Sequence, residues 1–412
     1  MKKDQSLLDT EITDKVDTAI RDSEYDALII FGADHIRYLT GAMIPTAQVA
    51  SPHKTAVFLR KGHEPLLLAP AGLRDSFRSM GRIRNVQAYY PHGPSVSGNE
   101  SPVSPRKETL EALVSSLVQD AGLESAKIGV TKRRVSQKES ERFREFLPKA
   151  EFLSCDEWIT GLRMVKTGAE RNLIEKIAYK ADHAITGAAH HVMVYATRPE
   201  KGLSEIIRVH GLERGLDMTG YESLAVGASG EHTATPWPEA PYFGVGGGKV
   251  LKEGELVRME LRASLDGYWT DAARPLTMGP PSKGQAEAHA GLNAVRQELL
   301  KALRPGVSCS EIASRITRFC GEHDVELSFD HGFGHGIGVE PVEPPYLDES
   351  DETALEAGMV LVLTPTVFGP EGELVRSYDT VVIEEDCARL TGTYRDWSTP
   401  YEAVRSYQHG GG

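Results

Sequence analysis

Apolar and polar positions follow one pattern over the first 150 residues. Short apolar runs, typical of buried strands, occupy 25–32, 55–62, 64–70 and 127–131. Helical spacing of apolar residues covers 107–122 and 136–150, and the second segment opens on Ser136, a residue that favours helix N-termini. Strands that alternate with helices predict an α/β domain with some parallel pairing.

From about residue 155 the pattern changes to long helices followed by long strands. Helical periodicity covers 169–194, 204–215, 282–303 and 308–322. Strand patterns cover 221–230, 254–264, 267–279, 358–368 and 374–386. This order predicts an α+β domain, a curved antiparallel sheet with helices on one side. We therefore place one domain at 1–160 and a second at 161–405.

Two carboxylates stand in the middle of a predicted hairpin. The turn Leu265-Asp266-Gly267 separates the strand of Glu260 from the strand of Asp271. Burying a charged group without a partner is costly, so we expect each carboxylate either to line a functional site or to pair with a cation. Because the strands pair, the two side chains can face one cavity. The alternative is ion pairing with nearby arginines: Asp271 with Arg274, and Glu260 with Arg258 or Arg262.

A glycine-rich segment, HGFGHGIG at 331–338, carries His331 and His335. Two histidines four apart on a helix would share a face and hold zinc. Each glycine between them costs a helix about 1 kcal/mol, so we expect an extended or looped backbone that another group approaches closely. Together with Glu260 and Asp271, His335 would form the beginning of a Mn, Fe or Zn site.

Length and composition narrow the class of protein. The 412 residues suffice for two domains, and the mixture of 40% hydrophobic and 25% charged residues is that of a globular chain. A net charge of −13 argues against nucleic acid as a partner. The four cysteines have no CxxC spacing and predict neither disulfides nor a zinc knuckle. No apolar run reaches the roughly 18 residues of a membrane span, and the start of the chain is no signal peptide, so we expect a cytoplasmic protein.

Several segments, in order, resemble the creatinase, aminopeptidase P and prolidase superfamily, whose catalytic domain has the pita-bread fold. The segments that carry the resemblance are 35–41, 162–184, 260–279, 331–338, 358–365 and 375–383. The resemblance implies a creatinase-like N-terminal domain, a pita-bread catalytic domain, an active site in that second domain, and a homodimer.

The chain departs from the metal site that this resemblance implies. Peptidase members hold two metal ions with Asp, Asp, His, Glu and Glu, and the matching positions here are Glu260, Asp271, His335, Thr364 and Tyr378. A neutral threonine and a tyrosine, whose ordinary pKa is about 10, do not replace two carboxylates at neutral pH. We therefore expect no cofactor, while a single Mn, Fe or Zn ion on Glu260, Asp271 and His335 stays open.

Two histidine positions of the family are also changed. The proton-shuttling histidine is Val342, and the substrate-binding histidine falls on Trp237, with His232 five residues upstream. Glu343 and Arg376 match the pattern. We expect His232, Trp237, Arg376 and Thr364 to contact substrate. Trp237 would form an apolar or cation-stacking wall of the pocket, and the alternative is a surface-loop aromatic that packs on its own domain.

These departures predict a creatinase-like, metal-independent hydrolase that cleaves a C–N bond of a small polar metabolite, with peptidase activity doubtful. His335 or His331 would be the general acid or base. We expect His335 within hydrogen-bond or single-water reach of Glu260 or Asp271, and His331 at the pocket entrance or hydrogen-bonded within its loop. Glu260, Asp271 and Glu343 would orient water or bind a cationic group, and Tyr378 would donate to an oxyanion. Three alternatives stay open: a metal-dependent Xaa-Pro dipeptidase-like hydrolase, a lyase or cyclisation enzyme, and a non-catalytic binding module. None of these needs a nucleic acid or a membrane.

Overall fold

The computed structural model describes residues 2–44, 54–80, 82–83, 85–90, 109–194, 199–220, 222–234, 247–328 and 332–392. The chain divides into two compact units, Met1–Arg163 and Met164–Gly412. No helix of the described residues is long and apolar enough to cross a bilayer.

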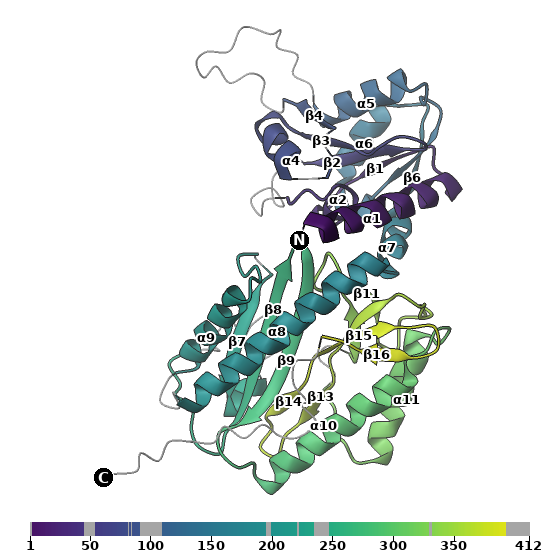
Figure 1. The fold of residues 1–412 in the computed structure, drawn as a ribbon. Helices are drawn as coiled ribbons and strands as arrows, with labels where there is room; N and C mark the ends of the chain where they lie inside the picture. The colour runs from purple at the N-terminus through teal and green to yellow at the C-terminus, as the bar shows by residue number, and fades with distance from the viewer. Residues whose placement is uncertain are drawn as a thin grey trace, which may run out of the picture. The chain divides into compact units, whose positions relative to one another are not determined.

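The first unit is a mixed sheet with helices (Figure 1). Its strands are β1 (Ala27–Ile30), β2 (Ala56–Arg60), β3 (Leu66–Pro70), β4 (Val86–Tyr89), β5 (Lys127–Val130) and β6 (Glu151–Ser154). Its α-helices are α1 (Lys2–Asp22), α2 (Ala33–Thr40), α4 (Arg74–Met80), α5 (Leu110–Asp120), α6 (Gln137–Phe146) and α7 (Asp156–Met164). The strand order is β4-β3-β2-β1-β5-β6, with parallel pairing of β3 with β4, β1 with β5 and β5 with β6. The predicted α/β domain is confirmed.

Local sequence explains the central elements of this sheet. All four residues of β1 are buried, as a continuous apolar run predicts for a strand covered on both faces. Helix α6 begins where Ser136 predicts, because its hydroxyl accepts the Glu139 amide N–H while the Glu139 carboxylate accepts the Ser136 N–H. The short strands β4 and β6 were not predicted.

The second unit consists of antiparallel sheets flanked by long helices (Figure 1). The helices are α8 (Gly168–Val194), α9 (Glu200–Glu213), α10 (Lys283–Ala302) and α11 (Cys309–Glu322). The strands are β7 (Leu224–Ser229), β8 (Leu256–Leu265), β9 (Tyr268–Thr277), β10 (Gly334–Gly336), β11 (Glu343–Tyr346), β12 (Val360–Leu363), β13 (Thr366–Phe368), β14 (Leu374–Arg376), β15 (Asp379–Ile383) and β16 (Ala388–Leu390). They form sheets β7-β8-β9, β11-β10-β12-β15-β16 and β13-β14. The predicted α+β pita-bread architecture is confirmed.

The helices cover these sheets in two groups. Helix α8 packs against β8 and β9, and α9 packs against β7. Helices α10 and α11 contribute Leu292, Val295, Ile312 and Ile316 to a buried apolar cluster that also contains residues of β12 and β15. Figure 1 shows α10 beside β13 and β14.

A buried ionic network joins the sheet of β9 to the sheet of β15. Arg274 contacts Asp182 of α8 at 2.8 Å and Asp379 of β15 at 3.1 Å, and Arg296 of α10 contacts Asp379 at 2.6 Å. Beside this network the Tyr378 amide donates to the Ala273 carbonyl at 3.0 Å. These contacts fix Tyr378 next to β9, where the site described below is found.

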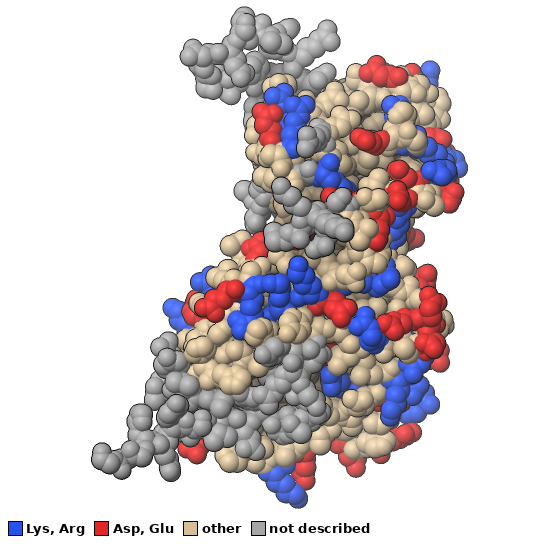
Figure 2. Space-filling model, viewed as in Figure 1, with Lys and Arg blue, Asp and Glu red and all other residues tan. Residues whose placement is uncertain are grey.

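Charges of both signs are interspersed over the face of the molecule in Figure 2. Lysine and arginine side chains lie beside aspartate and glutamate side chains across its described part. The expectation that nucleic acid is no partner stays a prediction.

Candidate active site

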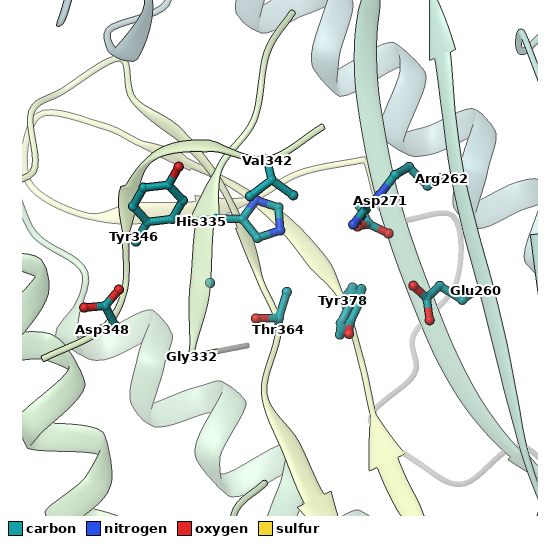
Figure 3. Close-up of a pocket in the computed structure, with 11 residues that line it drawn as sticks. Glu260, Arg262, Asp271, Gly332, His335, Val342, Tyr346, Asp348, Thr364 and Tyr378 are labelled. Atoms are coloured by element: carbon teal, nitrogen blue, oxygen red, sulfur yellow. Dashed lines mark hydrogen bonds and ion pairs between the residues drawn. The ribbon is translucent and has the colours of Figure 1, made fainter. Parts of the chain in front are cut away.

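A cavity of about 290 Å³ opens in the second unit (Figure 3). Its lining comes from β8, β9, β10 and β11, from residues next to β10 and β11, from the residue after β12 and from the residue before β15. The lining residues are Glu260, Arg262, Asp271, Gly332, Gly334, His335, Val342, Tyr346, Asp348, Thr364 and Tyr378.

The hairpin of β8 and β9 supplies the acidic side of this cavity. Its turn is Asp266-Gly267, and both residues have positive φ, 51° and 78°. A two-residue turn of this kind matches the twist of paired strands, which explains the Asp-Gly sequence. In the resulting register Glu260 lies opposite Ala273 and Arg262 opposite Asp271, so Glu260, Arg262 and Asp271 share one face.

Glu260 and Asp271 both lie near arginines, but the pairs differ in part from those that the sequence suggests. Arg262 binds Asp271 through Nε, at 2.9 Å from Oδ2, and through Nη2. Glu260 Oε2 lies 3.7 Å from Arg258 Nε, beyond hydrogen-bond distance. The pairing of Asp271 with Arg274 was wrong, because residues three apart on a strand point to opposite faces and Arg274 turns to Asp182 and Asp379.

Two carboxylate oxygens at the cavity are buried and have no hydrogen-bond partner: Glu260 Oε2 and Asp271 Oδ1. Both residues are 1% exposed. Burial raises the pKa of Asp271 to about 6, an effect that Arg262 opposes and Glu260 reinforces. An unsatisfied buried carboxylate oxygen is unfavourable, so this pair of oxygens is suited to a cation.

His335 of β10 lines the same cavity and is 7% exposed. Its Nδ1 is 2.9 Å from the Gly336 carbonyl oxygen, which can only accept, so Nδ1 carries the proton. In the neutral ring Nε2 is then the basic nitrogen. In the view of Figure 3, Thr364 lies below His335, and Tyr378 lies between Thr364 and Glu260. Single-water reach between His335 and a carboxylate stays a prediction.

The glycines around His335 permit the close approach that the sequence predicts. A Cβ at Gly336 would lie 2.3 Å from the Pro344 carbonyl oxygen, and one at Gly338 would lie 2.6 Å from Glu343 Oε1. Residues 334–336 form strand β10, which pairs with β11 on one side and β12 on the other. The prediction of an extended, closely packed backbone is confirmed for these residues.

Thr364 and Tyr378 both line the cavity. The Thr364 hydroxyl is buried without a hydrogen-bond partner. Burial raises the pKa of Tyr378 to about 12, and Arg376, whose Nη1 lies 3.4 Å from the phenol oxygen, partly opposes this. The phenol is therefore a neutral hydrogen-bond donor over the physiological pH range.

Glu343, Arg376 and His232 do not line the cavity. Glu343 pairs with Lys166 at 2.7 Å, and both side chains are almost fully buried. Arg376 is 3.5 Å from the Thr233 carbonyl oxygen, and His232 Nδ1 is 2.7 Å from Glu200 Oε2. His331 and Trp237 lie outside the described residues. The roles predicted for these five residues stay predictions.

Three lining residues were not predicted to have a role in the site: Arg262, Tyr346 and Asp348. Strand alternation could have identified Arg262, since it is two residues from Glu260 and on the same face. Tyr346 and Asp348 reach the cavity because β11 pairs with β10, a contact that no local pattern predicts.

The donors at the cavity fit one metal ion better than two. Among the described residues, no group of three or more histidine, cysteine, aspartate or glutamate side chains is placed to hold a metal. Glu260 and Asp271 fit a single divalent ion, because each offers a buried oxygen with no hydrogen-bond partner. Thr364 and the protonated Tyr378 offer no anionic ligand for a second ion.

Family comparisons agree with this architecture over most of the chain. The model of metallopeptidase family M24 matches residues 174–385, and the model of the creatinase/prolidase N-terminal domain matches 13–165. The Xaa-Pro dipeptidase of Pyrococcus furiosus is 32% identical over 257 residues, which is 62% of this chain and 71% of that protein. A creatinase of a Bacillus species is 25% identical over 324 residues, which is 73% of this chain and 75% of that protein.

Solved structures show the same fold. The X-Pro aminopeptidase from Thermotoga maritima superposes with a TM-score of 0.76 at 19% identity, over 94% of this chain and 99% of that one. The prolidase from Pyrococcus furiosus gives 0.70 at 22% identity, over 92% and 99%. At these identities the likeness establishes the fold alone.

These comparisons confirm the resemblance to the superfamily and correct one expectation. The prediction of a protein without a cofactor is wrong, because the matching family is one of metallopeptidases. That prediction rested on Thr364 and Tyr378 and on the change of the first ligand position to Glu260, and it gave too little weight to the carboxylates that remain. With a family model that spans residues 174–385 and a relative at 32% identity, the chain belongs to metallopeptidase family M24.

Proposed function

We propose that the chain is a metal-dependent hydrolase that cleaves the C–N bond of a small dipeptide-like substrate, of the Xaa-Pro type, in the cavity of the second unit. Peptidases are hydrolases, and the Xaa-Pro dipeptidases among the relatives support this alternative over the creatinase-like, metal-independent reaction that the sequence favoured. A cavity of about 290 Å³ suits a small ligand.

The observation that carries the proposal is the pair of buried oxygens on Glu260 and Asp271 that have no hydrogen-bond partner. These two residues would hold the metal ion. When bound, a divalent ion polarises a carbonyl oxygen and lowers the pKa of a bound water. Tyr378 is neutral and borders the same cavity, so its hydroxyl donates to the substrate carbonyl oxygen and stabilises the charge that develops there.

His335 serves as the proton carrier in this proposal. Its Nδ1 proton is held by the Gly336 carbonyl, which fixes the ring and leaves Nε2 to accept a proton. After accepting the proton, Nε2 can deliver it to the leaving nitrogen of the cleaved bond. The remaining wall of the cavity contains Val342 and Tyr346, which give the substrate side chain a partly apolar surface.

A substrate panel tests this function. Purified protein, freed of metal with a chelator and then supplied with Mn²⁺, is expected to hydrolyse Xaa-Pro dipeptides, and Glu260→Gln is expected to abolish that turnover. The panel includes creatine, because a creatinase is among the relatives. Turnover of creatine without turnover of any dipeptide would overturn the proposal.

A further inference from the structure

The cavity contains a cation that belongs to the protein itself, the guanidinium of Arg262. Arg262 and Glu260 project from the same face of β8, and Arg262 stands directly opposite Asp271 of β9. Its Nε and Nη2 both contact the same oxygen, Asp271 Oδ2. The side chain of Arg262 is 6% exposed and that of Asp271 is fully buried, so solvent does not weaken this contact.

This contact occupies one of the two carboxylate oxygens of Asp271. Oδ2 is occupied by the guanidinium, while Oδ1 is buried and has no partner. A carboxylate that bridges two metal ions uses both oxygens, and Asp271 has only one to offer. Glu260 lines the same cavity and its Oε2 also lacks a hydrogen-bond partner, so one buried oxygen of each carboxylate remains for a cation.

The charges around Glu260 and Asp271 disfavour a second divalent ion. The Arg258 guanidinium lies 3.7 Å from Glu260 Oε2, and Arg262 already neutralises part of Asp271. On the other side of the cavity Thr364 and Tyr378 are neutral. A second ion beside Asp271 would meet two guanidiniums, and like charges repel strongly where water is excluded. The remaining carboxylate of the cavity, Asp348, lies on the opposite side of the view in Figure 3 and accepts hydrogen bonds from the Ser350 amide and hydroxyl at 2.7 and 2.6 Å.

We propose that Arg262 limits this site to a single divalent ion by holding Asp271 Oδ2 and by placing a buried positive charge beside it. The inference rests on the proposed metal dependence of the enzyme. It assigns to Arg262 the role of setting how many metal ions the chain binds, and it says nothing about the substrate.

The test is a metal titration of the full chain. Protein stripped with a chelator is titrated with Mn²⁺, and free Mn²⁺ is followed by electron paramagnetic resonance. One ion per chain is expected. Two ions per chain would overturn the role of Arg262 and leave the proposed function intact. No binding at millimolar Mn²⁺ would overturn the proposed metal dependence and, with it, this inference.

Substitutions assign the effect to Arg262. Arg262→Met removes the competing charge and is expected to strengthen Mn²⁺ binding about tenfold or more, a change of about 1.4 kcal/mol per tenfold. Arg262→Lys retains the charge and is expected to bind Mn²⁺ as the unchanged protein does. Arg315→Met removes an exposed arginine that pairs with Glu298, and it serves as the control with unchanged binding. Weaker binding in Arg262→Met than in Arg262→Lys, with both variants folded by circular dichroism, would show that Arg262 assists the ion, which contradicts the proposal.

Discussion

Asp271 lies at the centre of the site, and its surroundings make its charge unfavourable. Burial raises the pKa of this carboxyl from 3.8 to about 6, even though Arg262 stabilises the ionised form. A group whose pKa is higher in the folded state binds its proton more tightly when folded. The stabilisation of the folded state by this tighter proton binding is therefore complete below about pH 4. It is lost as the pH rises through about 6.

Asp271→Asn is expected to remove this pH dependence in metal-free protein. The stability of the unchanged protein relative to the variant is expected to fall by on the order of 3 kcal/mol between pH 4 and pH 7.5. Urea unfolding at both pH values in the presence of a chelator measures the change. Asp75→Asn is the control, because Asp75 is fully exposed and its pKa is lowered. A difference between protein and variant that stays constant across this range would contradict the shift.

Tyr378 offers a second test at the scale of one residue. Because its pKa is raised to about 12, the phenol keeps its proton and can donate to a developing oxyanion. Tyr378→Phe is expected to lower kcat on a dipeptide by about 10²- to 10³-fold while KM changes little. Steady-state kinetics measure both values, with the exposed Tyr179→Phe as the control. An unchanged kcat would remove Tyr378 from the mechanism.

The elements that carry the site differ in how far local sequence determines them. The hairpin of β8 and β9 was predictable, because the Asp-Gly turn and the strand period fix which side chains share a face. Counting residues back from the same turn places Arg262 opposite Asp271, so this ion pair was also predictable from the sequence. Strand β10 was predictable only as extended backbone. Its pairing with β11, which brings Tyr346 to the cavity, depends on a long-range register that a single sequence does not reveal.

A buried ion pair joins β11 to the segment before α8. Lys166 Nζ and Glu343 Oε1 are 2.7 Å apart, and their side chains are 1% and 3% exposed. Lys166→Met leaves a buried carboxylate without its main cation and is expected to lower the free energy of unfolding by about 3–5 kcal/mol. Chemical denaturation measures this loss. The double variant Lys166→Met, Glu343→Gln is expected to regain part of it, whereas equal loss in both variants would mean that the pair contributes little.

At the scale of the whole molecule, the candidate metal ligands belong to one of the two units. Glu260, Asp271 and the other residues that line the cavity all lie within Met164–Gly412. The first unit has a buried core of its own, formed by β1, β2, β5, α5 and α6. A ligand that binds only the folded second unit stabilises that unit by mass action.

Thermal unfolding in the presence of Mn²⁺ is therefore expected to separate the two units. A chain with two cores can unfold in more than one step, and only the step of the second unit should move upward with Mn²⁺. At a free Mn²⁺ concentration about 100 times Kd, the stabilisation is about 2.7 kcal/mol. Differential scanning calorimetry measures the shift, and Asp271→Asn, which lacks one metal ligand, should abolish it. If both steps moved together, or if the variant responded as the unchanged protein does, the ion would not be bound where Glu260 and Asp271 offer their free oxygens.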